Sequence, residues 1–207
     1  GAPQSWSGTT PLLLSAEHGN TSCVVALVQL GADARRTNHA GIGAMYAAAA
    51  NGAPRDCIIT LQQLGCPVNL AQDDGATPVF IAAQAGDCAM VRLLHDFGAD
   101  LDTSRRDGMT PTYAAAMKNH PQAVVTLKEF GANVNLTHVE GDGPLHVAAM
   151  YGHVDCVREL ISGGATVDLV MKRSNTSMSM ATPLHLACRN GHYDVVEVLL
   201  SAGANAR

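Results

Sequence analysis

The chain has 207 residues, of which 47% are hydrophobic and 15% charged, and its formal net charge is −5 at pH 7. The net negative charge, together with basic runs no longer than a doublet, argues against nucleic-acid binding. No apolar stretch approaches the roughly 18 residues that a membrane-spanning helix needs, and no secretory signal is visible. We therefore expect neither membrane insertion nor secretion.

A four-residue motif recurs along the chain. Its six copies are Thr10–Leu13, Gly43–Tyr46, Thr77–Phe80, Thr110–Tyr113, Gly143–His146 and Thr182–His185, with second residues 33, 34, 33, 33 and 39 positions apart. A Gly-Ala-Asp-like segment follows each copy after 20 or 21 residues. Such a fixed period is typical of a stack of small units, each burying its apolar faces only between its neighbours.

The sixth copy is the most regular unit. Thr182 has the side chain of a helix N-cap, and Pro183 suits the first helical position, where no backbone donor is needed. His185 is placed to bond back to Thr182, as in a capping box. Gly191 is expected to end this inner helix. The apolar pattern of residues 195–200 then predicts an outer helix with one buried face.

These motifs, with the pairs Ala148-Ala149 and Gly191-His192, resemble the ankyrin repeat over essentially the whole chain. The resemblance implies an all-α fold, an ankyrin-repeat α-solenoid of stacked helix-turn-helix units with projecting β-turn fingers. It also implies a concave groove between fingers and inner helices. We expect a single array over residues 1–207, with units at 5–37, 38–71, 72–104, 105–137, 138–176 and 177–207, the fifth containing an insertion at 171–176.

Two departures from the repeat stand out. The second unit has Gly43-Ala44 where Thr-Pro is expected. Glycine is an acceptable cap, but Ala44 lacks the preset φ of proline, so this inner helix should start less firmly. The finger that contains the 171–176 insertion has Met180 where the other fingers have glycine. The insertion is either a tolerated surface loop or a specificity loop in which a serine or threonine accepts a phosphate.

The cysteines and histidines are assigned to the scaffold. Cys23, Cys57 and Cys156 share one outer-helix position, which favours burial, reduced thiols and a cytosolic or nuclear setting. Most of the nine histidines recur at scaffold positions: His146 and His185 are the fourth residues of the motif, and His120, His153 and His192 follow the inner helix. The sequence lacks a Gly-rich phosphate loop, a G-x-S-x-G motif and an H-E-x-x-H motif. We expect no catalysis, no cofactor and no metal.

In the ankyrin family, partner contacts come mostly from finger tips and from the last two residues of each inner helix. At those positions we assign partner binding to Trp6, Ile42, Asp73, Asp74, Arg106, Met109, Met117, Lys118, Val139, Glu140, Asp142, Met150, Tyr151, Met178 and Arg189. The apolar members of the fourth and fifth units should cluster, rimmed by charges that include Asp142, and take an apolar anchor. The alternative is that some of the methionines pack between inner helices.

These observations favour a non-catalytic protein-protein interaction module or scaffold, which binds a partner protein or a linear peptide in its groove and is monomeric as a fragment. The terminal units lack the polar faces of capping repeats. A second hypothesis is therefore a substrate-recruitment or autoinhibitory segment of a larger enzyme, channel or ubiquitin ligase. A third is a spacer whose groove stays empty.

Overall fold

The computed structural model describes residues 8–171 and 180–206, which form twelve α-helices and no β-strand. The helices are α1 (Pro11–Glu17), α2 (Thr21–Gln29), α3 (Ala44–Ala50), α4 (Arg55–Gln63), α5 (Pro78–Ala85), α6 (Cys88–Asp96), α7 (Pro111–Met117), α8 (Pro121–Glu129), α9 (Pro144–Tyr151), α10 (Val154–Ser162), α11 (Pro183–Asn190) and α12 (Tyr193–Ser201). The all-α prediction is confirmed. None of these helices is long and apolar enough to cross a bilayer.

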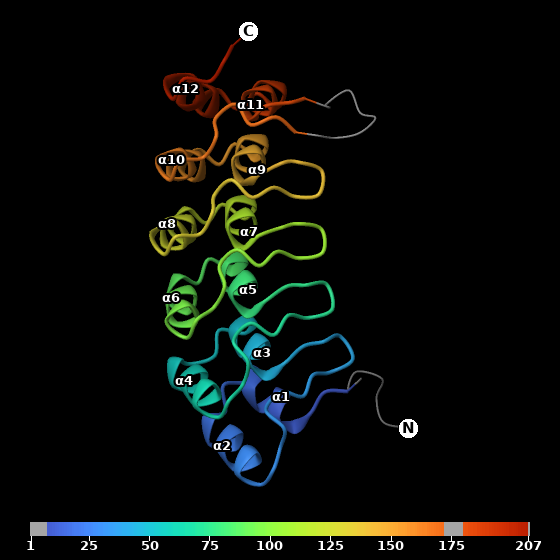
Figure 1. Cartoon of the computed structure of the whole chain (residues 1–207). Helices are drawn as coiled ribbons and strands as arrows, with labels where there is room; N and C mark the ends of the chain where they lie inside the picture. The colour runs from blue at the N-terminus through green and yellow to red at the C-terminus, as the bar shows by residue number, and fades with distance from the viewer. Residues whose placement is uncertain (1–7, 172–179, 207) are drawn as a thin grey trace. The chain divides into compact units, whose positions relative to one another are not determined.

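The chain divides into two compact units. The first comprises Gly1–Ala82 and Ala89–Asp100, and the second comprises Ala83–Cys88 and Leu101–Arg207. In the first unit, the inner helix α1 packs on α3 and the outer helix α2 packs on α4. In the second unit, α7, α9 and α11 pack in succession, and so do α8, α10 and α12. Within each unit the helix pairs are therefore stacked, and fingers project before α3, α5, α7 and α9 (Figure 1).

The inner helices begin at the predicted caps. The hydroxyls of Thr10, Thr110 and Thr182 accept hydrogen bonds from backbone amides three residues later, and Thr77 does the same. His185 Nδ1 in turn accepts from the Thr182 amide at 3.2 Å, which completes the predicted capping box. Gly43 has no side chain, so the N-terminus of α3 has no side-chain cap. These bonds satisfy amides that the first helical turn leaves without intrahelical partners.

A ladder of Asn and Asp side chains joins consecutive repeats within each unit. Its side-chain members lie 33 residues apart, and each accepts a hydrogen bond from a backbone amide of the next repeat. The bonds are Asp100 N to Asn69 Oδ1 (3.0 Å), Asn133 N to Asp102 Oδ1 (2.9 Å), Thr166 N to Asn135 Oδ1 (2.8 Å) and Asn205 N to Asp168 Oδ1 (3.1 Å). The ladder fixes the register between neighbouring repeats.

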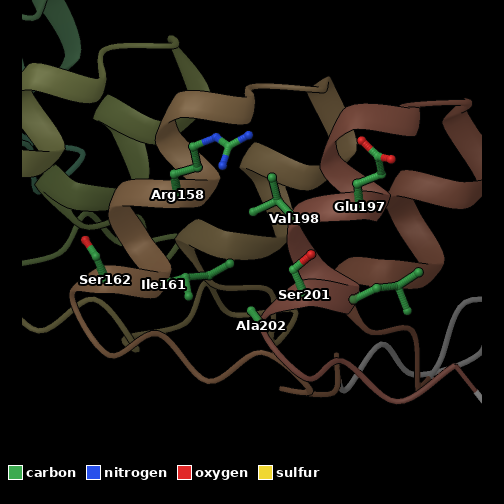
Figure 2. Close-up of a pocket in the computed structure, with 8 residues that line it drawn as sticks. Arg158, Ile161, Ser162, Glu197, Val198, Ser201 and Ala202 are labelled. Carbon is green, nitrogen blue, oxygen red and sulfur yellow. The ribbon is translucent and has the colours of Figure 1, made fainter.

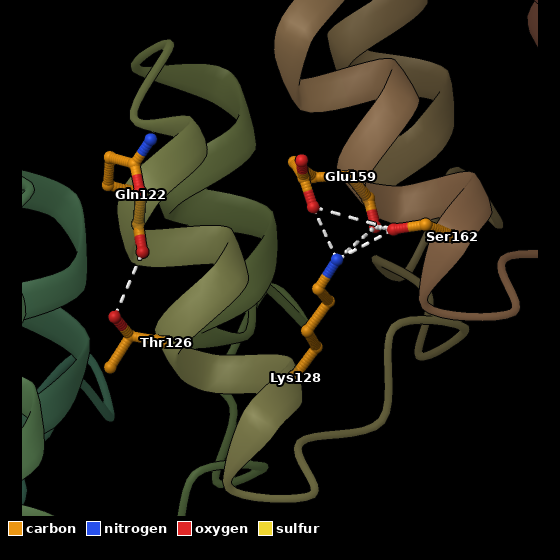
Figure 3. Close-up of polar contacts among 5 residues, drawn as sticks. All are labelled: Gln122, Thr126, Lys128, Glu159 and Ser162. Carbon is orange, nitrogen blue, oxygen red and sulfur yellow. Dashed lines mark hydrogen bonds and ion pairs between the residues drawn. The ribbon is translucent and has the colours of Figure 1, made fainter.

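A polar contact also links the outer helices α8 and α10. The Lys128 ammonium contacts the Glu159 carboxylate and lies 2.6 Å from Ser162 Oγ and 3.3 Å from the Glu159 carbonyl (Figure 3). Three oxygen acceptors thus surround one ammonium group that is partly buried. A lysine stem lying between two helices also covers apolar surface, so this contact adds packing to the charge interaction.

The cysteine prediction holds for two residues of three. Cys57 and Cys156 are fully buried, but Cys23 is exposed. The thiols of Cys57 and Cys156 interact with Thr21 and Asn119, respectively, in the preceding repeat. This outer-helix position therefore faces the preceding repeat. Burial of Cys23 was a wrong prediction because no helix precedes its repeat within the described residues.

The last finger closes without glycine. Met180 has φ +89°, whereas Gly141 at the same position of the preceding finger has φ +85°. The Met180 amide donates to the Met171 carbonyl, and the Met171 amide donates to the Ala181 carbonyl, both at 3.0 Å. A left-handed backbone costs a non-glycine residue about 1–2 kcal/mol, so this turn is strained. Apart from Met171, the insertion at 171–176 lies outside the described residues.

Candidate functional site

Three large apolar side chains are exposed on the fingers and inner-helix ends of the second unit. Val139, in the fifth finger, is 70% exposed, Tyr151, the last residue of α9, is 52% exposed, and Met180 is 69% exposed. Together with Met117, the last residue of α7, they define what we call the finger-side surface. Interaction sites are often contiguous exposed apolar patches, and tyrosine and methionine are enriched in them.

Tyr151 and Met117 are joined through a histidine. The Tyr151 ring stacks on His153, with ring centroids 5.8 Å apart and planes inclined by 26°. His153 Nε2 in turn lies 3.3 Å from the Met117 carbonyl oxygen. Burial lowers the pKa of His153, which favours a neutral ring that donates to this carbonyl. The structure therefore connects two of the predicted site residues from consecutive repeats.

Val139 is held by the backbone of the preceding finger. Its amide donates to the Asp107 carbonyl at 2.9 Å. The Asp107 carboxylate accepts from the Met109 amide at 3.0 Å and pairs with Arg105 at 3.3 Å. The fourth and fifth fingers are thus bonded to each other, so Val139 is presented on a fixed backbone. An ordered anchor loses less conformational entropy when a partner binds.

The prediction that Asp142 belongs to an exposed charged rim is wrong. Its side chain is buried, and the residue is only 6% exposed. Asp142 Oδ2 accepts a hydrogen bond from the Tyr113 hydroxyl at 2.6 Å, and the His138 ring packs beside it. The hydroxyl donor offsets part of the cost of removing this carboxylate from water. Asp142 therefore supports the finger from inside and does not face solvent.

Met150 matches the alternative that some methionines are packing residues. Its half-buried side chain packs against a buried cluster of Met171, Ala181 and Leu186. Its carbonyl oxygen is contacted by His192 Nε2 at 3.0 Å and accepts from Asn190 Nδ2 at 2.8 Å. Met150 thus belongs mainly to the contact between the last two repeats. An exposed apolar cluster that includes it remains a prediction.

The other predicted site residues lie in three settings. Exposed on fingers or helix ends are Asp73, Arg106, Lys118, Glu140 and Arg189. Half-buried are Ile42, Asp74, Met109 and Met117, and the Asp74 carboxylate caps its own turn by accepting from the Ala76 amide at 2.9 Å. Trp6 and Met178 lie outside the described residues. The charges that remain exposed have both signs.

The scaffold is held in part by His146, His153 and His192. His146 is fully buried, and its Nδ1 accepts from the Gly143 amide at 3.1 Å, as the motif predicts. Burial lowers the pKa of His146, so the ring stays neutral. His192 contacts a carbonyl of the preceding inner helix, as His153 does. These rings serve as caps and inter-repeat links.

A groove between the outer helices α10 and α12 was not predicted from the sequence. It has a volume of about 770 Å³ and is lined by Arg158, Ile161, Ser162, Glu197, Val198, Leu200, Ser201 and Ala202. Figure 2 shows side chains from both helices along it. Leu200 is 44% exposed, although the helical pattern placed it on the buried face. The groove offers a second surface against which binding to the finger-side surface can be compared.

Comparisons with known proteins agree with this architecture. A family model described as ankyrin repeats in three copies matches residues 44–138 and 116–207, and a single ankyrin repeat model matches residues 7–39. The chain is also similar to the human ASB11 ankyrin repeat domain, with 28% sequence identity and a TM-score of 0.82. That match covers 96% of this chain and 86% of the other. None of these matches indicates an enzyme family.

Proposed function

We propose that this chain, which belongs to the ankyrin repeat family, binds a partner protein or a linear peptide through the finger-side surface of its second unit. Ankyrin repeats are generally protein-protein interaction modules, and such domains are typically non-catalytic. The family gives the class of function only. The choice of surface comes from the side chains that this particular chain exposes.

The observation that carries this proposal is the exposure of Val139 and Tyr151 on an ordered backbone. Val139 is fixed by the Asp107 carbonyl, and Tyr151 is oriented by His153. Fully burying a valine-sized side chain contributes about 1.5–3 kcal/mol, and tyrosine is among the residues that most often dominate binding energy. A partner that covers both side chains gains this free energy with little ordering cost.

The exposed charges beside these anchors suggest a partner of mixed charge. Lys118 follows Met117 at the end of α7, Glu140 follows Val139, and Arg189 lies near the end of α11. Charges on the rim of an interface mainly set the association rate and exclude wrong partners. The partner we propose therefore carries an apolar anchor flanked by both acidic and basic residues.

An alternative is that this segment recruits a substrate, or inhibits a neighbouring domain, within a larger protein. The finger-side surface would then bind either another segment of that larger protein or the substrate of a catalytic domain within it. A cytosolic or nuclear location fits either case, since buried thiols such as Cys57 and Cys156 are compatible with a reducing compartment.

The test begins with a displayed peptide library selected against the immobilised chain. Dissociation constants of the selected peptides are then measured by isothermal titration calorimetry for Tyr151→Ala, Val139→Ser and, as a matched control, Leu200→Ser. We expect the first two substitutions to weaken binding roughly tenfold or more and the control to change it less than about twofold. Equal losses of affinity for all three variants would contradict the assignment of the binding surface. If the selection yields no specific binder, the result would favour the hypothesis that the array is a spacer with an empty groove.

A further inference from the structure

The fifth finger brings three potential metal ligands together. His138, Glu140 and Asp142 alternate along the finger, and one donor atom from each lies within 4.8 Å of the others. The His138 amide donates to the Asp142 carbonyl at 2.8 Å, and the Gly141 amide donates to the His138 carbonyl at 2.8 Å. These two backbone bonds hold the ends of the finger together. The ligand set is therefore organised by the fold before any ion binds.

One of these donor atoms is buried without a hydrogen-bond partner. Asp142 Oδ2 is satisfied by Tyr113, but Oδ1 accepts no hydrogen bond. A buried carboxylate oxygen that lacks a donor is costly, because it has lost water and gained nothing in exchange. The His138 ring is the neighbour of Asp142 Oδ1, so this unsatisfied oxygen points toward another of the three potential ligands.

The separation between His138 and Asp142 also fits an ion between them. The Nδ1 atom of His138 lies 3.5 Å from Asp142 Oδ1. The same Nδ1 atom accepts a hydrogen bond from the Glu140 backbone amide at 3.3 Å. A nitrogen used as an acceptor carries no proton, so it cannot donate to the carboxylate. Two ligands on a tetrahedral zinc ion, each about 2.0–2.1 Å from the metal, lie about 3.3 Å apart. The observed spacing is therefore longer than a good hydrogen bond and close to that of two ligands on one metal.

The finger does not need a histidine for its own turn. In the second finger, Asn38 occupies the position of His138, and its Oδ1 accepts from the amides of Ala40 and Ile42 at 2.9 and 3.0 Å. Asn38 Oδ1 thus accepts the same kind of backbone hydrogen bond that His138 Nδ1 accepts from the Glu140 amide. The imidazole adds a capacity that turn formation alone does not require.

We propose that His138, Glu140 and Asp142 bind one divalent transition-metal ion of the zinc type. One neutral imidazole and two carboxylates form a donor set that zinc accepts, and two negative charges balance the ion. Binding at Nδ1 exchanges the Glu140 amide contact for a metal bond. Three protein ligands leave one position for water. The ion joins Glu140 at the finger tip to the buried Asp142, directly beside Val139.

The test uses the untagged full chain with Zn²⁺ alone, and with Co²⁺ as a spectroscopic probe. Isothermal titration gives the stoichiometry and affinity for the unmodified protein, His138→Asn, Glu140→Gln and the matched finger control His39→Ala. The His138→Asn variant retains a capping side chain, so it separates metal binding from turn formation. Circular dichroism establishes that each variant is folded.

We expect the unmodified protein and His39→Ala to bind one ion more than His138→Asn, and Glu140→Gln to weaken this ion at least about tenfold. The corresponding Co²⁺ absorption should lack the thiolate charge-transfer band that a cysteine site produces. Unchanged stoichiometry and affinity in both folded variants would overturn the proposal. A thiolate band that persists in His138→Asn, with no loss of an ion, would assign the metal to cysteines and overturn it equally.

Discussion

The Tyr113 hydroxyl donates a 2.6 Å hydrogen bond to Asp142 Oδ2, across 29 residues of sequence. Tyr113 lies in α7 and Asp142 lies in the next finger, and both are buried. The Tyr113 ring also stacks on His138, with centroids 5.9 Å apart. One tyrosine thus ties an inner helix to the finger that carries Val139 and the proposed metal ligands.

Tyr113→Phe should destabilise the protein by about 1.5–3 kcal/mol, since it removes the donor to a buried carboxylate and leaves the ring in place. Urea denaturation followed by circular dichroism measures this change. Tyr193→Phe is the control, because its hydroxyl bonds to Glu197 at the surface and its removal should destabilise the protein much less. If the two substitutions lower the free energy of unfolding equally, the hydrogen bond to Asp142 stabilises the protein no more than a surface hydrogen bond does.

Asn135 should be more sensitive to alanine than to aspartate. Its Oδ1 accepts from the Thr166 amide and its Nδ2 donates to the Gly164 carbonyl at 3.0 Å, so Asn135→Ala loses both bonds and about 1–2 kcal/mol. Asn135→Asp keeps the acceptor, as Asp102 and Asp168 do at the same position. In chemical denaturation, the free energy of unfolding of Asn135→Asp should lie between those of the unmodified protein and Asn135→Ala. If both variants match the unmodified protein, the inter-repeat ladder does not contribute to stability.

Met180→Gly should stabilise the protein by about 0.5–1 kcal/mol. The substitution relieves a left-handed backbone that costs methionine about 1–2 kcal/mol, and the entropy cost of glycine offsets part of the gain. Little packing is lost because Met180 is mostly exposed. The control is Asn119→Gly, where the native φ is +59°. Asparagine already tolerates this region and its side chain interacts with the Cys156 thiol, so the gain should be smaller. Thermal denaturation of both variants provides the comparison, and a destabilised Met180→Gly would refute the strain.

The six cysteines should alkylate at different rates. Burial raises the pKa of Cys156 to about 12 and that of Cys66 to about 11, and it also raises the pKa of Cys57. At pH 8 these thiols are therefore almost entirely protonated, and they are also inaccessible. Iodoacetamide should modify the exposed Cys23 and Cys188 first, as peptide mass mapping reveals. Rapid modification of Cys156 in folded protein would contradict its burial.

The repeat period made the helices predictable. Thr-Pro and glycine at fixed intervals set the helix starts and ends, because capping depends on a few neighbouring residues. The unusual backbone of Met180 follows the same logic, since every other described finger has glycine there. The ladder through Asn69, Asp102, Asn135 and Asp168 was not predicted, although its members recur every 33 residues.

The surroundings of individual side chains were harder to predict. The burial of Asp142 depends on Tyr113 in the preceding repeat, and no local pattern carries that information. The exposure of Cys23 depends on whether a helix precedes its own. Met150 and Tyr151 are adjacent, yet Met150 packs against the cluster of Met171, Ala181 and Leu186, whereas Tyr151 is exposed. Neighbouring repeats decide these cases, as expected when stability comes from interfaces between units.

The most direct test of the proposed function is a photo-crosslinking measurement. The photoreactive residue p-benzoylphenylalanine replaces Val139 in one protein and Leu200 in another, and each is irradiated with the selected peptide. We predict a crosslinked product at position 139 and none at position 200, with the adduct located by mass spectrometry. A crosslink at position 200 in the outer groove, with none at position 139, would contradict the finger-side surface as the binding site.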